Sequence, residues 1–167
     1  KFKGGSTLNY SGTALAVPKA LTLEGSGKMQ NTNSLNLSGA NGKLNLSGIS
    51  LANVKTSANN SGLSITKNST VTDFSVSNMT PVSIASGKNL SGTITVNAGG
   101  TIQLNSAGTL AANSSLKGGT LKVNESSTVS GSVSILGNST IDVASGKTVI
   151  FSDGVINTQN YELTLNN

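Results

Sequence analysis

Apolar residues recur in this chain as an apolar–polar–apolar triplet that returns about every twenty residues. The eight triplets begin at Leu21, Leu44, Leu63, Val82, Ile102, Leu121, Ile141 and Leu163. After a first interval of 23 residues, their starts lie 19, 19, 20, 19, 20 and 22 residues apart. A fixed period of this length indicates a repeat protein in which each unit stacks on its neighbours.

Two further apolar series follow each triplet at a similar distance. The first contains Met29, Ala52, Val71, Leu90, Leu110, Val129 and Val149. The second contains Leu35, Leu37, Val54, Phe74, Val76, Ile94, Val96, Leu116, Val133, Ile135 and Val155. Each repeat therefore holds three short segments in which apolar residues alternate with Ser, Thr, Asn or Lys, as in half-buried β-strands. Gly, Asn and Ser lie between the segments, where the chain must bend.

Three short strands per repeat predict an all-β fold, a right-handed parallel β-helix (β-solenoid) with three sides and about eight turns of roughly 20 residues. We assign residues 21–167 to this β-helix. The equal position of the triplets predicts one buried ladder, each residue directly above the last, formed by Leu44, Leu63, Val82, Ile102, Leu121 and Ile141. The polar positions between them predict that Lys122 and Asp142 lie side by side on the surface.

Residues 1–20 fit the repeat less well. Phe2, Leu8, Tyr10, Leu15 and Val17 are apolar positions of a β pattern, but their spacing is irregular and a proline follows. We interpret this segment as an irregular N-terminal turn or as a cap and assembly segment.

Composition narrows the possible partners. Only 10% of the residues are charged and 3% aromatic, and the chain contains no Cys and no His. The net charge of +5 comes from lysines spread singly along the sequence, without the aromatic residues that stack on bases, so we expect no nucleic-acid partner. The sequence has no apolar run near 18 residues, and we expect no membrane insertion.

The sequence also offers no candidate catalytic pair. Enzymes built on parallel β-helices, such as pectate lyases, use clustered carboxylates with Arg, Lys or His, and often Ca²⁺. The six acidic residues of this chain are scattered, and both Arg and His are absent. General acid–base chemistry needs two titrating groups that converge on one substrate. We therefore expect no enzymatic activity, no catalytic residues, no cofactor and no bound metal.

The repeats from Ser91 to Leu165 resemble the passenger β-helices of bacterial autotransporters and of filamentous-haemagglutinin-type adhesins. The resemblance is carried by residues 92–102 (GTITVNAGGTI), 119–124 (GTLKVN) and 138–149 (NSTIDVASGKTV). It implies a secreted protein at the bacterial cell surface or in the extracellular matrix, used in adhesion, aggregation or biofilm. Surface glycans and host or cell-surface receptors are the partners that it suggests.

The last triplet suggests a more specific role. We expect the β-helix to expose unpaired backbone groups and apolar side chains at Leu163–Leu165, an open edge to which another strand can add. A head-to-tail contact that does not close produces a filament. The expected self-assembly interface consists of Phe2, Leu8, Tyr10, Leu15, Val17, Tyr161, Leu163 and Leu165.

Three functions therefore remain open. The first is a subunit of a self-assembling surface fibre, and the second is a passenger fragment of a secreted adhesin. The third is a carbohydrate-binding or carbohydrate-cleaving β-helix.

Overall fold

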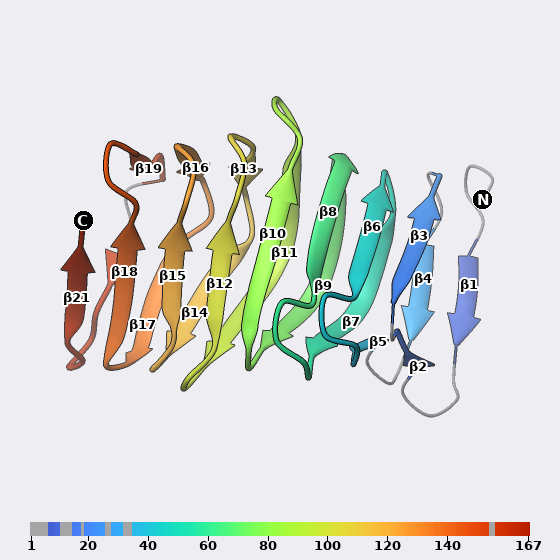
Figure 1. The fold of residues 1–167 in the computed structure, drawn as a ribbon, viewed down its shortest axis with the longest axis horizontal. Coiled ribbons are helices and arrows are strands. Elements are labelled where there is room, and N and C mark those ends of the chain that lie inside the picture. Colours follow the sequence, from blue (N-terminus) through green and yellow to red (C-terminus); the bar gives the residue numbers. More distant parts are fainter. Residues whose placement is uncertain (1–6, 11–14, 18, 26–27, 32–34, 154–155) are drawn as a thin grey trace.

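The computed structural model describes residues 7–10, 15–17, 19–25, 28–31, 35–153 and 156–167. These residues contain no helix, and their 21 strands form two parallel sheets that stack turn upon turn as a β-solenoid. Figure 1 shows the strands side by side along the long axis, with the N-terminal strands at one end and β21 at the other. The predicted all-β solenoid is therefore confirmed.

Sheet B has eight strands in the described residues, and they are the eight predicted triplets. Its strands are β3 (Ala20–Glu24), β6 (Lys43–Ser47), β8 (Gly62–Lys67), β10 (Met79–Ile84), β12 (Thr101–Leu104), β15 (Thr120–Val123), β18 (Ser139–Val143) and β21 (Leu163–Asn166). These strands belong to a solenoid of about seven turns, close to the expected number of about eight.

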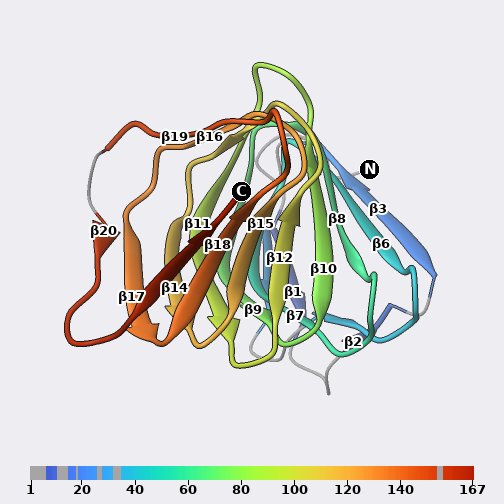
Figure 2. The same ribbon diagram turned by 60° about the vertical axis from the view of Figure 1, so that its left-hand side comes forward.

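Sheet A collects the other segments of every turn, thirteen strands in the described residues. Its strands are β1 (Thr7–Tyr10), β2 (Leu15–Ala16), β4 (Lys28–Asn31), β5 (Leu35–Leu37), β7 (Ser50–Thr56), β9 (Ser69–Val76), β11 (Asn89–Asn97), β13 (Thr109–Leu110), β14 (Asn113–Lys117), β16 (Ser127–Val129), β17 (Val133–Gly137), β19 (Val149–Phe151) and β20 (Ile156–Asn157). Strand β11 pairs with β13 through its first half and with β14 through its second half, so sheet A covers two sides of the turn. Figure 2 shows the turns from the C-terminal end, closing around the interior.

The core is a stack of aliphatic side chains. The six ladder residues expected from the triplets are all buried, and Phe74 is the largest buried side chain. In the apolar series that begins with Met29, the inward residue of the second turn is Leu51, which pairs with Met29 and Val71, so the assignment of Ala52 to this position was wrong. Leu51 is the larger apolar group, and its burial gains more free energy.

The ladder changes register twice along sheet B, first between β10 and β12. Val82 lies opposite Leu63 on one side but opposite Leu104 on the other, and Ile102 lies opposite Thr80. The expected contact of Val82 with Ile102 was therefore wrong. The physical reason is that β10 begins one inward position earlier, at the buried Thr80. A shift of two residues keeps every side chain on its own face, so the core tolerates it.

The same shift recurs at the last turn. Leu165, rather than Leu163, lies opposite Ile141, and Leu163 lies opposite Ser139. On the outer face of sheet B, three threonines nevertheless lie opposite one another in successive turns: Thr120, Thr140 and Thr164.

Buried hydroxyl groups occupy several corners of the solenoid. In each case the hydroxyl donates to the carbonyl oxygen of the residue two positions earlier, at 2.6–3.3 Å, and the residues are Ser69, Thr80, Ser114, Ser127 and Ser139. Because a buried polar group is costly without a partner, these bonds explain how hydroxyls enter an apolar core.

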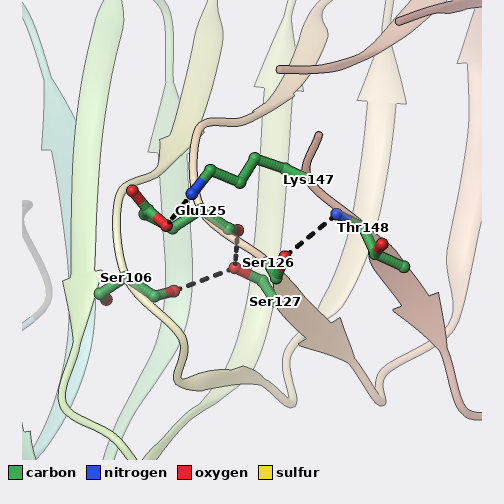
Figure 3. Close-up of polar contacts among 6 residues, drawn as sticks. All are labelled: Ser106, Glu125, Ser126, Ser127, Lys147 and Thr148. Atoms are coloured by element: carbon green, nitrogen blue, oxygen red, sulfur yellow. Dashed lines mark hydrogen bonds and ion pairs between the residues drawn. The ribbon is translucent and has the colours of Figure 1, made fainter. Parts of the chain in front are cut away.

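Figure 3 shows one such corner, before β16. The Ser127 hydroxyl lies 2.6 Å from the Glu125 carbonyl oxygen of its own corner and 2.9 Å from the Ser106 carbonyl oxygen one turn away. Above it, the Lys147 ammonium donates to the Glu125 carboxylate at 2.7 Å. Contacts within a corner and between turns thus fix both the bend and the stacking.

Candidate functional site

The last turn of the solenoid gathers exposed apolar side chains at one end of the molecule. Five large apolar residues are classed as exposed in the described chain, and four of them, Ile150, Ile156, Tyr161 and Leu165, lie in this turn. Leu165 is the most exposed, at 70%. Apolar side chains gathered in this way on a folded protein indicate an interaction surface.

A hollow of about 470 Å³ opens on this end face. Its lining is mostly aliphatic and aromatic and includes Ile141, Val143, Val149, Phe151, Ile156, Leu163 and Leu165. In the interior the next turn covers the corresponding residues, whereas Val143, Val149, Phe151 and Leu163 are only partly buried. The hollow is therefore the cross-section of the core at this end.

Strand β21 forms the edge of sheet B at this face. In the described residues it pairs with β18 alone, and β3 at the opposite edge pairs with β6 alone. Leu21 and Leu23 of β3 are partly buried, as Leu163 of β21 is. Both edges thus combine half-covered leucines with a strand that pairs on one side only among the described strands.

The structure places the predicted interface residues at both ends of the molecule. At the C-terminal end, Tyr161 and Leu165 are exposed and Leu163 is half-buried. At the N-terminal end, Leu8 and Tyr10 belong to β1, which pairs with β4.

The remaining predicted interface residues differ in their placement. Leu15 belongs to β2, which pairs with β5. Val17 is 4% exposed and lies in the core, while Phe2 falls outside the described residues. The described part of segment 1–20 therefore continues sheet A as a partial turn.

Sequence reasoning missed part of the end face. Phe151 and Ile156 line the hollow, but neither belonged to the apolar series, in which Val149 and Val155 were chosen instead. Phe151 takes the inward position opposite Val129, and Val149 lies opposite Ser127. Val155 falls outside the described residues. The Val149-Ile150-Phe151 alternation was the signal that could have identified Phe151.

A second concave surface lies on the outer face of sheet B. This groove, about 250 Å³, is lined by Lys43, Asn45, Gly62, Leu63, Ser64, Pro81, Ser83 and Asn105. A Cβ atom at Gly62 would lie 2.0 Å from the Pro81 carbonyl oxygen, so only glycine fits at this position. The lining offers amides, hydroxyls and one ammonium group, all of which can form hydrogen bonds.

The outer face also carries the predicted charge pair. Lys122 and Asp142 lie opposite each other in β15 and β18, with 2.9 Å between the Lys122 Nζ and Asp142 Oδ2 atoms. Their side chains are 38% and 30% exposed, so the pair stabilises the fold by at most about 1 kcal/mol. The prediction that they lie side by side is confirmed.

Two kinds of feature are absent from the described residues. These residues contain no group of three or more acidic, His or Cys side chains that could hold a metal ion. They also contain no helix long and apolar enough to cross a membrane.

The fold defines the chain as a β-solenoid repeat protein. Comparison with protein-family models, with curated proteins and with solved structures found no match to it. The likeness to adhesin passengers therefore rests on the repeat style of the sequence alone.

Proposed function

We propose that this chain is a non-enzymatic structural rod that acts outside a bacterial cell as a subunit of a surface fibre. In this fibre, copies stack head to tail along the solenoid axis. The extracellular setting is supported by the resemblance of the repeats to secreted adhesin passengers.

The observation that carries the proposal is the apolar end face of the last turn. Residues of the same type are covered by the next turn in the interior, whereas Leu165 is exposed on β21, which pairs with β18 alone among the described strands. Covering the hollow with another β layer removes apolar surface from water, at about 25 cal/mol per Å². Backbone pairing along the strand edges adds affinity without special side chains.

The test is whether the purified protein assembles. We expect sedimentation velocity to show concentration-dependent growth, and electron micrographs to show fibres one solenoid wide. Leu165→Asp places a charge on the end face without touching the buried core, and it should abolish growth. Met79→Asp is the matched control, because Met79 is exposed on β10, four strands along sheet B from β21.

Two results would overturn the fibre proposal. One is a monomer at high concentration, which would favour the adhesin-passenger alternative. The other is equal assembly by Leu165→Asp and the unmodified protein.

Saccharide binding is a second candidate function, favoured by the groove on sheet B. The amides and hydroxyls that line the groove can hydrogen-bond to sugar hydroxyls. The Pro81 ring offers an apolar contact for the face of a pyranose. Ser83→Phe would fill the groove, whereas Ser134→Phe, on the outer face of β17, leaves it open. Binding of soluble oligosaccharides, followed by NMR, should be lost only in the first variant; no binding by the unmodified protein refutes this candidate.

A further inference from the structure

The two edge strands of sheet B have matching side chains. Strand β3 carries Leu21-Thr22-Leu23 and strand β21 carries Leu163-Thr164-Leu165. In both strands the threonine is exposed, and the leucines are incompletely covered. One more strand on each edge would complete the burial of the leucines. The two outermost described strands of sheet B thus carry the same Leu-Thr-Leu triplet.

The interior of sheet B shows which alignment a junction would take. All its strands are parallel, and on the outer face Thr120, Thr140 and Thr164 lie opposite one another. The inward positions match less strictly, since Thr80 lies opposite Ile102 and Ser139 opposite Leu163. Placing Leu21 on Leu163 brings Leu23 onto Leu165 and Thr22 beside Thr164. A shift of two residues would put Leu21 on Leu165 and Thr22 beside Asn166. The shifted alignment makes one leucine contact instead of two and breaks the threonine row.

The distribution of charge along the chain also favours contact between the N-terminal end of one copy and the C-terminal end of another. Residues 1–88 carry eight of the eleven lysines and two of the six acids, whereas residues 89–167 carry three lysines and four acids. At the ends themselves, the exposed Lys19 directly precedes β3 and the exposed Glu162 directly precedes β21. In the unshifted alignment Glu162 lies opposite Ala20, one position along the strand from Lys19 of the following copy. Two like ends would instead bring charges of the same sign together.

We propose that β3 of one copy adds in parallel to β21 of the next, with Thr22 directly opposite Thr164. This inference rests on the head-to-tail assembly proposed above and specifies its register on sheet B. The occupant of the end face is a second copy of this chain. On sheet B, strand β3 thus takes the role that the sequence analysis gave to apolar residues between positions 2 and 17. On sheet A, strands β1 and β2 of one copy would meet β19 and β20 of the other.

Cysteine cross-linking tests the register directly, because the chain has no native cysteine. Directly opposed residues in neighbouring strands have Cα atoms about 5 Å apart, which a disulfide can bridge, whereas residues two positions out of register are too distant. The test variant is Thr22→Cys/Thr164→Cys, and the matched control is Thr22→Cys/Asn166→Cys. All three positions are exposed, so neither variant disturbs the core.

Each variant is assembled under reducing conditions and then oxidised. We expect a ladder of disulfide-linked oligomers from the Thr164 variant, at least about tenfold stronger than from the Asn166 control. An equimolar mixture of the two single variants, Thr22→Cys and Thr164→Cys, should give only dimers that contain one of each.

The outcomes separate this inference from the proposed function. A stronger ladder from the Asn166 variant would overturn the register. Fibres without a ladder from either variant would overturn the β3–β21 junction and leave the fibre proposal standing. If the unmodified protein forms no fibres, both fall.

Discussion

Beyond its aliphatic ladder, this fold depends on residues whose hydroxyl groups are buried and hydrogen-bonded. The Ser139 hydroxyl lies 2.6 Å from the Gly137 carbonyl oxygen and accepts a hydrogen bond from the Gly118 backbone N–H at 3.1 Å. Ser139→Ala leaves that N–H without its hydroxyl partner, and should lower the free energy of unfolding by about 1–3 kcal/mol. Ser134→Ala, on the outer face of β17, is the control and should change it by less than about 0.5 kcal/mol. Urea unfolding measures both; equal midpoints for the two variants would contradict the structural role of the hydroxyl.

A second test at the scale of the residue introduces a charge into the buried aliphatic ladder. Ile102 is buried between Thr80 and Leu121 in the neighbouring turns. Ile102→Asp would place a carboxylate among apolar side chains, at a cost of roughly 3 kcal/mol or more, and should lower the melting temperature strongly. Gln103→Asp changes the adjacent outward position and should leave the melting temperature nearly unchanged. A melting temperature of Ile102→Asp within error of the unmodified protein would refute the inward assignment.

At the scale of the element, the long strand β11 must bend to serve two sides of the solenoid. The bend falls at Gly92, which has φ 115°, and the register against β9 shifts between Gly92 and Ile94. A Cβ atom at this position would lie 1.8 Å from the Val71 carbonyl oxygen. The strand can therefore turn this corner only with glycine, because both the backbone angle and the space exclude a side chain.

Substitution of Gly92, compared with a control glycine, separates the cost of the steric clash from the cost of the unfavourable backbone angle. Gly92→Ala should lower the free energy of unfolding by roughly 2 kcal/mol or more, since it adds a steric clash to an unfavourable φ. Gly87→Ala is the control, because Gly87 has φ 67° with no atom within 4 Å of its would-be Cβ, and it should cost about 1–2 kcal/mol. Denaturant midpoints distinguish them, and a Gly92 variant no less stable than the Gly87 variant would count against the bend.

The sequence predicts elements well here and their exact alignment less well. Period-two alternation identified all eight strands of sheet B, because each turn buries apolar residues at the same position. It could not find the shift at β10, where the extra inward residue is Thr80, a polar side chain that the pattern assigns to the surface. A buried threonine is recognisable only from its hydrogen bonds to the Asn78 carbonyl oxygen and the Thr56 hydroxyl.

The same limit applied to the candidate interface. Leu163 and Leu165 belong to the final triplet, and the structure places both on the end hollow. Phe151 was missed because the corner before β19 moves the inward position two residues beyond Val149. The match between β3 and β21 also escaped notice, since a pattern read along one chain does not show which strands end as the edges of a sheet.

At the scale of the whole molecule, the uneven charge along the axis makes the proposed fibre sensitive to salt. Exposed charges more than a Debye length apart are screened, and this length is about 8 Å at 0.15 M ionic strength. Raising NaCl should therefore slow the addition of new copies while leaving the apolar contact intact.

Glu162→Lys should weaken association at low salt by roughly 1 kcal/mol, the upper range for an exposed pair, or about fivefold in Kd. Lys19→Glu should do the same, and a mixture in which the Glu162→Lys end meets the Lys19→Glu end should recover affinity. Light scattering at 20–500 mM NaCl measures these effects; equal assembly of both reversed variants at low salt would show that the ends meet without help from their charges.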